Sequence, residues 1–242
     1  MRRRVRAEMP GEKATGPESR QVRRQPVRTQ ELKEAKKAQP RPPQPDASRA
    51  AAGLRLLQTY AALAGRGEHL LGKLLAGRAP RQWAHYPDGD AIDHSSGYQW
   101  FYHSHSPEDR PGAVEHGHVH LFARRPLWRR PRHLLAIGFD PKGLPISLFT
   151  VGSQVTGDLM LGAESTLELL ASMALDTGHS EVDTVIRSVV RLCAPALQVL
   201  MRQRDEALRS RRAAGKAADE MPDLLSEVRI ARVLGSIRGT LS

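Results

Sequence analysis

Polar and apolar residues alternate along two short segments in the middle of the chain, 98–105 and 116–122. Both segments are rich in aromatic and β-branched side chains, which favour β-strands. Residues 106–112 lie between them and contain two prolines and a glycine, a composition typical of a loop. The pattern predicts an antiparallel β-hairpin.

A second hairpin is predicted for residues 132–151. Its two apolar runs, 133–139 and 144–151, flank Asp140-Pro-Lys-Gly143, which suits a tight reversal of the chain. The two hairpins together predict one antiparallel sheet of about four strands over residues 98–151. Residues 81–96 precede this sheet and are expected to form a loop, because their Asp-Gly-Asp sequence favours a turn.

Apolar residues at helical spacing flank the predicted sheet on both sides. The helical regions cover residues 48–76, 158–212 and 223–236. The middle region is expected to hold one helix from Leu159 to Leu175 and a longer one from Ser180 to about Arg212, kinked at Pro195. The predicted fold class is α+β, with helices from both ends of the chain covering the sheet.

Residues 1–45 differ in composition from the rest of the chain. They hold 13 Lys or Arg residues against 5 Glu, together with seven prolines and no aromatic residue. Such a segment buries too little apolar surface to fold, so we expect a disordered basic tail before a single domain over residues 46–242. The tail could make a weak, salt-dependent contact with nucleic acid. The alternatives are a solvated leader and a translation start further downstream.

Cysteine usage and hydropathy limit the class of protein. The single cysteine, Cys193, excludes an intramolecular disulfide and a metal site built from cysteines alone. No apolar run approaches the ~18 residues of a membrane span, so the expectation is a soluble, cytoplasmic protein without a membrane partner. The predicted helix at residues 223–236 could dock on the domain or on a second copy, which would make a homodimer.

Histidines are the strongest indication of chemistry in the sequence. Eight of the ten fall between His85 and His133. Side chains two residues apart in a strand share a face. The histidines expected on the shared face of the first hairpin are His103, His105, His116, His118 and His120.

The strand register decides which of these histidines meet. A register that pairs the two phenylalanines also pairs the histidines: Phe101 with Phe122, His103 with His120, and His105 with His118. Cross-strand Cβ atoms lie roughly 4.5 to 5.5 Å apart, close enough for the imidazoles to bind one ion. We therefore expect a mononuclear transition-metal site, for zinc, iron, copper or manganese, with these four histidines as ligands and His116 next. A three-histidine set with an open position would permit metal-dependent catalysis on a small-molecule substrate.

Other groups near the hairpin leave alternatives open. The imidazoles could hydrogen-bond to each other without an ion, or line a pocket for a small ligand. Acids and histidines of residues 81–96 could complete a coordination shell or remain surface groups; they are His85, Asp88, Asp90, Asp93 and His94. His133 is expected at a strand edge rather than among the ligands. The basic loop at residues 124–132 is expected to be solvated, with attraction of an anionic substrate or nucleic acid as the alternative.

Two resemblances accompany these patterns. His116-Gly-His118-Val-His120-Leu-Phe122 resembles the histidine triad of nucleotide hydrolases and transferases, which implies His118 as a nucleophile toward phosphorus, supported by His116 and His120. Four segments together resemble an uncharacterised bacterial family of unknown function over residues 50–240. These segments are His85-Tyr-Pro-x-Gly-Asp90, Tyr102-His-x-His105, Glu115-His-Gly-His-x-His120 and Val155-Thr-Gly-Asp158.

Deletion of residues 1–45 tests the predicted domain boundary. Since a disordered segment adds no buried contacts, the thermal midpoint and any metal content should stay unchanged, while any retention of nucleic acid should be lost. Thermal unfolding and metal analysis of the truncated and full chains would measure this. A large drop in the midpoint would show that the tail packs on the domain.

Overall fold

The computed structural model describes residues 46–105, 114–157, 160–215 and 222–230, so the predicted tail lies outside the described residues. In the described part, six strands form one sheet in the order β1-β2-β3-β4-β5-β6, and every neighbouring pair is antiparallel. The strands are β1 Tyr86–Asp93, β2 Tyr98–Ser104, β3 Gly117–Ala123, β4 Arg132–Phe139, β5 Pro145–Val151 and β6 Leu224–Arg229. The predicted α+β class is confirmed, with six strands instead of about four.

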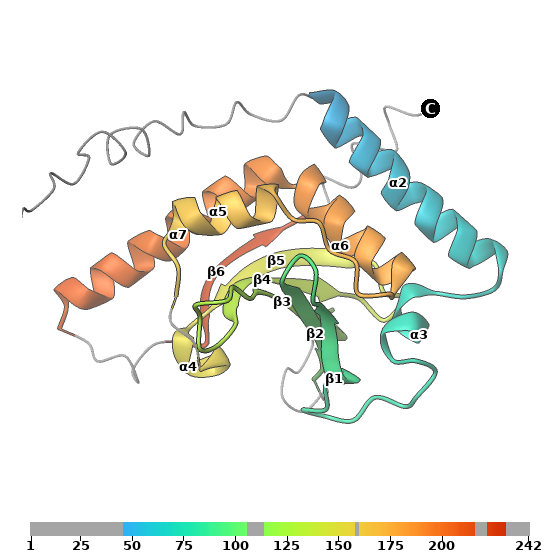
Figure 1. Ribbon diagram of the computed structural model, residues 1–242, viewed down its shortest axis with the longest axis horizontal. Helices are drawn as coiled ribbons and strands as arrows, with labels where there is room; N and C mark the ends of the chain where they lie inside the picture. The colour runs from blue at the N-terminus through green and yellow to red at the C-terminus, as the bar shows by residue number, and fades with distance from the viewer. Residues whose placement is uncertain (1–45, 106–113, 158–159, 216–221, 231–242) are drawn as a thin grey trace, which may run out of the picture. The chain divides into compact units, whose positions relative to one another are not determined.

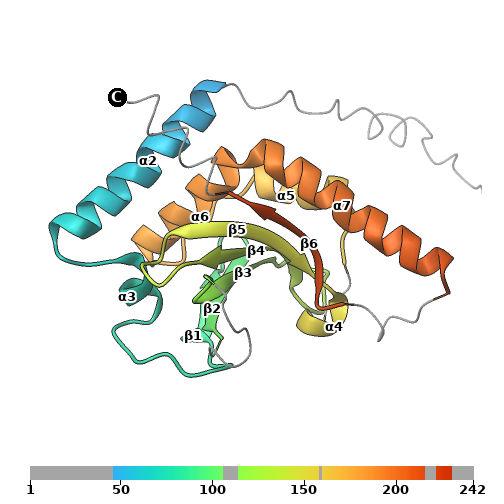
Figure 2. The same cartoon turned by 180° about the vertical axis from the view of Figure 1, so that it is seen from behind.

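The helices α5, α6 and α7 lie along one face of this sheet, and α2 packs on α6 (Figures 1 and 2). The helices are α2 Asp46–Gly65, α3 Leu70–Leu74, α4 Ser153–Thr156, α5 Ala163–Ala171, α6 Ser180–Leu192 and α7 Ala194–Ala213. Across the described ranges, no single helix is long and apolar enough to cross a membrane, and only the bent pair α6 and α7 meets that test by length and composition.

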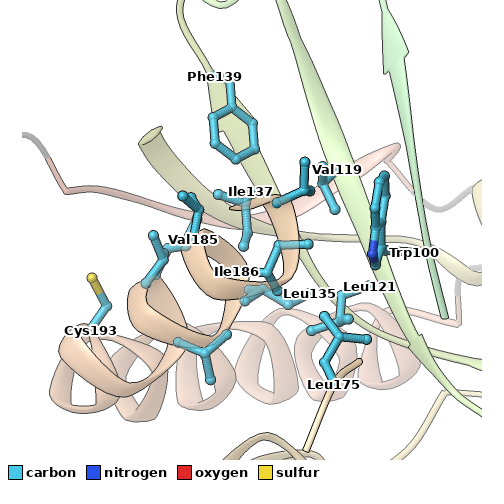
Figure 3. Close-up of a cluster of buried hydrophobic side chains, with 14 of the residues drawn as sticks. Trp100, Val119, Leu121, Leu135, Ile137, Phe139, Leu175, Val185, Ile186 and Cys193 are labelled. Carbon is cyan, nitrogen blue, oxygen red and sulfur yellow. The ribbon is translucent and has the colours of Figure 1, made fainter. Parts of the chain in front are cut away.

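The core forms between the helices and one side of the strands. Trp100, Val119 and Ile137 project from neighbouring strands toward Val185 and Ile186 of α6, and all five side chains are buried (Figure 3). Because successive strand residues point to opposite faces, the residues between them project from the other face. That second face carries the histidines and phenylalanines of β2 and β3.

Strand β1 corrects the expected loop at residues 81–96. The Asp-Gly-Asp sequence does not reverse the chain. It lies within an edge strand, where the register with β2 breaks between Tyr86 and Ala91. Gly89 and Asp90 adopt positive φ angles of 77° and 61° there, a conformation that Gly and Asp tolerate better than most residues. Turn-forming residues thus mark an irregularity inside a strand.

Strand β6 corrects the terminal helix predicted for residues 223–236. The segment Leu224–Arg229 pairs with β5, and the hydroxyls of Thr150 and Ser226 lie 2.7 Å apart in a buried hydrogen bond. Without β6, the backbone N–H and C=O groups on that edge of β5 would lack strand partners. The need to pair these groups outweighs the helical spacing of so short a segment. Residues 231–236 lie outside the described part.

Glycine and proline set the helix ends in the region predicted as helical over 158–212. The expected helix from Leu159 to Leu175 is shorter, because Gly162 is the residue before the first turn of α5. The longer predicted helix is divided at Cys193 into α6 and α7, which are bent by 76°. Pro195 lies in the first turn of α7, where its missing N–H costs little.

Asp183 of α6 offers a test of how the helix layer is fastened to the sheet. Its buried carboxylate accepts hydrogen bonds from Trp100 Nε1 at 2.8 Å and from the Thr177 amide at 2.7 Å. Asp183→Ala would leave these donors without an acceptor, so we expect a loss of roughly 2–4 kcal/mol in the free energy of unfolding. Chemical denaturation would measure this loss. The exposed Asp176→Ala control should cost less than about 0.5 kcal/mol, and equal effects would contradict the assignment.

Candidate metal centre

Three histidine nitrogens converge on the sheet face opposite α6. His118 Nε2 lies 2.6 Å from His103 Nε2 of β2 and 3.0 Å from His120 Nε2 of β3. The three residues are 8%, 3% and 2% exposed for His103, His118 and His120. These three residues, called the histidine centre below, are a group that could hold a metal ion.

The register of β2 and β3 differs from the expected one by two residues. His103 pairs with His118, and Phe101 pairs with His120. A two-residue shift leaves each side chain on its face, so the histidines still meet, with different partners. Gly117 helps to set this register, because a Cβ atom there would collide with the His103 carbonyl oxygen and the Tyr102 hydroxyl.

Glu115 orients His118 from outside the centre. Its Oε1 lies 2.8 Å from His118 Nδ1, and its side chain is only 9% exposed. The carboxylate fits because Gly138 on β4 has no side chain; a Cβ atom there would collide with Glu115 Oε2 and Ser147 Oγ. An ionised carboxylate accepts the Nδ1 proton, so neutral His118 carries its lone pair on Nε2, facing the other two imidazoles.

His133 contacts the outer nitrogen of His120, as Glu115 contacts the outer nitrogen of His118. Its Nε2 lies 3.0 Å from His120 Nδ1, and the residue is buried on β4. Burial, and then the Arg204 charge, lowers the pKa of His133 to about 3. Burial, and then the neighbouring histidines, holds the pKa of His120 well below its usual range. Both imidazoles are therefore neutral near pH 7 and have lone pairs to offer. His133 lies near the start of β4 and outside the groups that could hold a metal ion, as expected, and it also contacts His120.

His105 lies beside the histidine centre and belongs to a second group. Its ring is 5.1 Å from that of His103 and 4.9 Å from that of His118, and His105, Glu115 and His118 also form a set that could hold a metal ion. The Trp83 ring stands edge-on to His103 and His105 at 6.1 and 5.8 Å. Trp83 is 65% exposed and has a positive φ of 63°, so this aromatic cover is held in a costly backbone conformation.

Other candidate residues lie outside the histidine centre. His116 Nδ1 is 2.6 Å from the Tyr102 hydroxyl, so His116 does not join His118 and His120 as predicted. His85 stacks on Phe101 with ring centroids 3.7 Å apart. The acids of the same region have different partners: Asp88 pairs with Arg78, Asp90 with His85, and Asp93 with Ser95 and Ser96. His94 is exposed.

The sequence analysis does not predict two residues that contact the histidine centre, Glu115 and His133. Glu115 precedes the histidine run and was noted only as part of a motif, and His133 was set aside because a basic loop separates it from the run. Both reach the centre through β4: His133 is paired with Phe122 of β3, and Gly138 leaves room for Glu115. The feature that could have identified them is the second predicted hairpin. Its first strand, β4, brings residues that are distant in sequence beside β3.

Comparison with known proteins assigns a family but no chemistry. A family described as a domain of unknown function (DUF6969) matches residues 50–230, so the chain belongs to this family. Searches among curated proteins and among solved structures found no match. The expected resemblance to an uncharacterised family is confirmed, whereas the resemblance to the histidine-triad hydrolases receives no support.

The contact with Glu115 predicts the proton position on His118. In metal-free protein near pH 7, long-range ¹H–¹⁵N correlation spectra should show neutral His118 protonated at Nδ1, because the carboxylate accepts that proton. Glu115→Gln removes the charge and should give a mixture of the two tautomers. Ser147→Ala, which removes a weaker contact to the same carboxylate at 3.4 Å, should not. A His118 ring protonated at Nε2 in the unaltered chain would contradict the prediction.

Proposed function

We propose that this member of the DUF6969 family binds one transition metal ion through the Nε2 atoms of His103, His118 and His120. The observation that carries the proposal is the position of His118 Nε2, in contact with the Nε2 atoms of both other histidines. Glu115 and His133 would act from outside, fixing the orientation of His118 and His120. Such outer partners are usual for histidines that bind metal.

A hydrogen-bonded network without an ion fits these contacts poorly. An imidazole nitrogen offers either one N–H donor or one lone pair. With Nδ1 bonded to Glu115, His118 has one lone pair for two neighbours at 2.6 and 3.0 Å. It can accept one good hydrogen bond there, so the Nε2 atoms of His103 and His120 compete for the same lone pair. A metal ion would instead accept all three lone pairs.

The distances between the histidine Nε2 atoms are close to those found around a bound metal ion. Two nitrogens bound to one ion at about 2.0 to 2.1 Å in tetrahedral geometry are roughly 3.3 Å apart. The two short contacts would therefore have to lengthen by less than ~1 Å, and rotation of the imidazole rings supplies a change of that size. No rearrangement of the strands is required.

The ligand type favours certain ions and a certain chemistry. Imidazole nitrogens suit zinc, copper and iron, whereas manganese prefers oxygen ligands. Structural zinc sites are built mainly from cysteines, while three histidines with a fourth position for water are typical of catalytic zinc. We therefore extend the proposal to metal-dependent chemistry on a small-molecule substrate, in which the bound ion would act as a Lewis acid. Localisation in the cytoplasm and a homodimer stay predictions.

Metal analysis of protein prepared without a histidine tag tests the proposal. After exposure to zinc, copper, iron or manganese and removal of excess ion, we expect about one ion per chain. The double change His103→Ala with His118→Ala should abolish binding, since it removes two of three ligands. His94→Ala, an exposed histidine outside the centre, is the matched control and should leave the metal content unchanged.

Trp83 provides an independent readout. Because its ring lies about 6 Å from those of His103 and His105, copper bound at the centre should quench its fluorescence, and Trp83→Phe should remove that response. Trp128→Phe should retain it. Full metal retention in the histidine double variant, or failure of every ion to bind the unaltered chain, would disprove the proposal.

A further inference from the structure

A second site lies at one end of the sheet, away from the histidine centre. A cavity of about 300 Å³ opens between the turn joining β1 to β2 and the segment joining β3 to β4. Arginines dominate its lining: Arg124, Arg125, Arg129 and Arg130. Its volume is at the lower end of the range for small-molecule sites.

Three of the four arginines, Arg124, Arg125 and Arg130, are held in place without being neutralised. Arg125 Nη1 donates to the carbonyl oxygens of Arg124 at 2.8 Å and Ser96 at 3.4 Å, and Arg130 donates to the Gly157 carbonyl at 3.1 Å. Arg124 donates to the side-chain oxygen of Gln99. A guanidinium has five N–H donors, so most donors are left for a ligand. Within the described residues, no carboxylate is bonded to any of these four arginines.

The acid in the lining is already committed to other contacts. Asp93 accepts hydrogen bonds from the amides of Ser95, Ser96 and Asp176 at 2.9, 3.1 and 3.0 Å, and from both serine hydroxyls. Although burial opposes ionisation, these hydrogen bonds hold the pKa of Asp93 well below its usual range. Its carboxylate therefore orders the turn, and its five donors compete with any arginine for its oxygens.

The two backbones that form the cavity are packed tightly and stiffened. Gly97 has φ +73°, and a Cβ atom there would lie 2.6 Å from the Arg124 carbonyl oxygen, so only glycine permits this approach. Pro126 and Pro131 restrict the backbone of the arginine segment, and both line the cavity. Trp128 adds a half-buried aromatic side chain. The backbone that carries the arginine side chains is therefore preorganised.

We propose that this cavity binds a small ligand bearing phosphate groups. The planar fork of arginine pairs its N–H groups with two oxygens of a phosphate, and several forks around one cavity suit a diphosphate better than a single charge. Nothing in this inference depends on metal binding by the histidine centre. A single-stranded nucleic acid would need an extended basic groove, whereas the arginines here surround one small cavity.

Calorimetric titration of the full chain with inorganic pyrophosphate at about 0.15 M salt tests the site. We expect saturable binding at one site. Arg129→Gln breaks no described contact and should weaken binding on the order of tenfold, and the pair Arg129→Gln with Arg130→Gln on the order of a hundredfold. Because Arg130 also bonds to Gly157, the thermal midpoint of the pair is measured to show that it folds.

Controls separate this site from general charge. Arg202→Gln with Arg212→Gln removes two exposed charges from α7 and should leave the affinity unchanged. The basic segment at residues 1–45 is present in every variant, so it cannot produce the difference. Equal weakening in the α7 variant, absence of saturable pyrophosphate binding, or tighter binding of citrate would overturn the proposal. Binding of an oligonucleotide that pyrophosphate cannot displace would also overturn it.

Discussion

Antiparallel pairing of β2 with β3 determines where the imidazoles of this protein meet. On the core side, the pairing sets Trp100 beside Leu121 and Tyr102 beside Val119, where all four side chains pack under the helices. The same hydrogen bonds set His103 beside His118 on the other side. Because side chains alternate between faces, the apolar packing that stabilises the fold also fixes the position of the histidines. The apolar core and the candidate metal centre therefore depend on the same register of β2 and β3.

The second face of the sheet is unusual because its polar groups are buried. Burial of an imidazole without a hydrogen-bond partner is costly, so each ring needs a partner. Outer partners exist for His118 and His120, namely Glu115 and His133. The inner nitrogens face each other, and the Nε2 atoms of His103 and His120 both lie against the single Nε2 lone pair of His118. This convergence of three nitrogens is the physical reason to propose a ligand between the three rings.

The sequence predicted which face of the strands carries the histidines better than it predicted which residues pair across the strands. Alternation along residues 98–105 and 116–122 was sufficient to place His103, His118 and His120 on one face. It could not choose the register, because a shift of two residues preserves the alternation. The edge strands were missed for a related reason: β1 contains turn-forming residues, and β6 is short enough to fit helical spacing. Both segments form strands because their backbone groups pair with a neighbouring strand, and no local sequence pattern reveals that pairing.

The candidate metal centre exists only in the folded sheet. His103 comes from β2, His118 and His120 come from β3, and the outer partner His133 comes from β4. Gly138 of β4 makes the room that Glu115 occupies. No single segment carries the arrangement, so an unfolded chain would bind an ion far more weakly than the folded one. Binding to the folded state alone stabilises that state by mass action. An ion in the centre would therefore join β2 to β3 through its ligands and strengthen the pairing of these two strands.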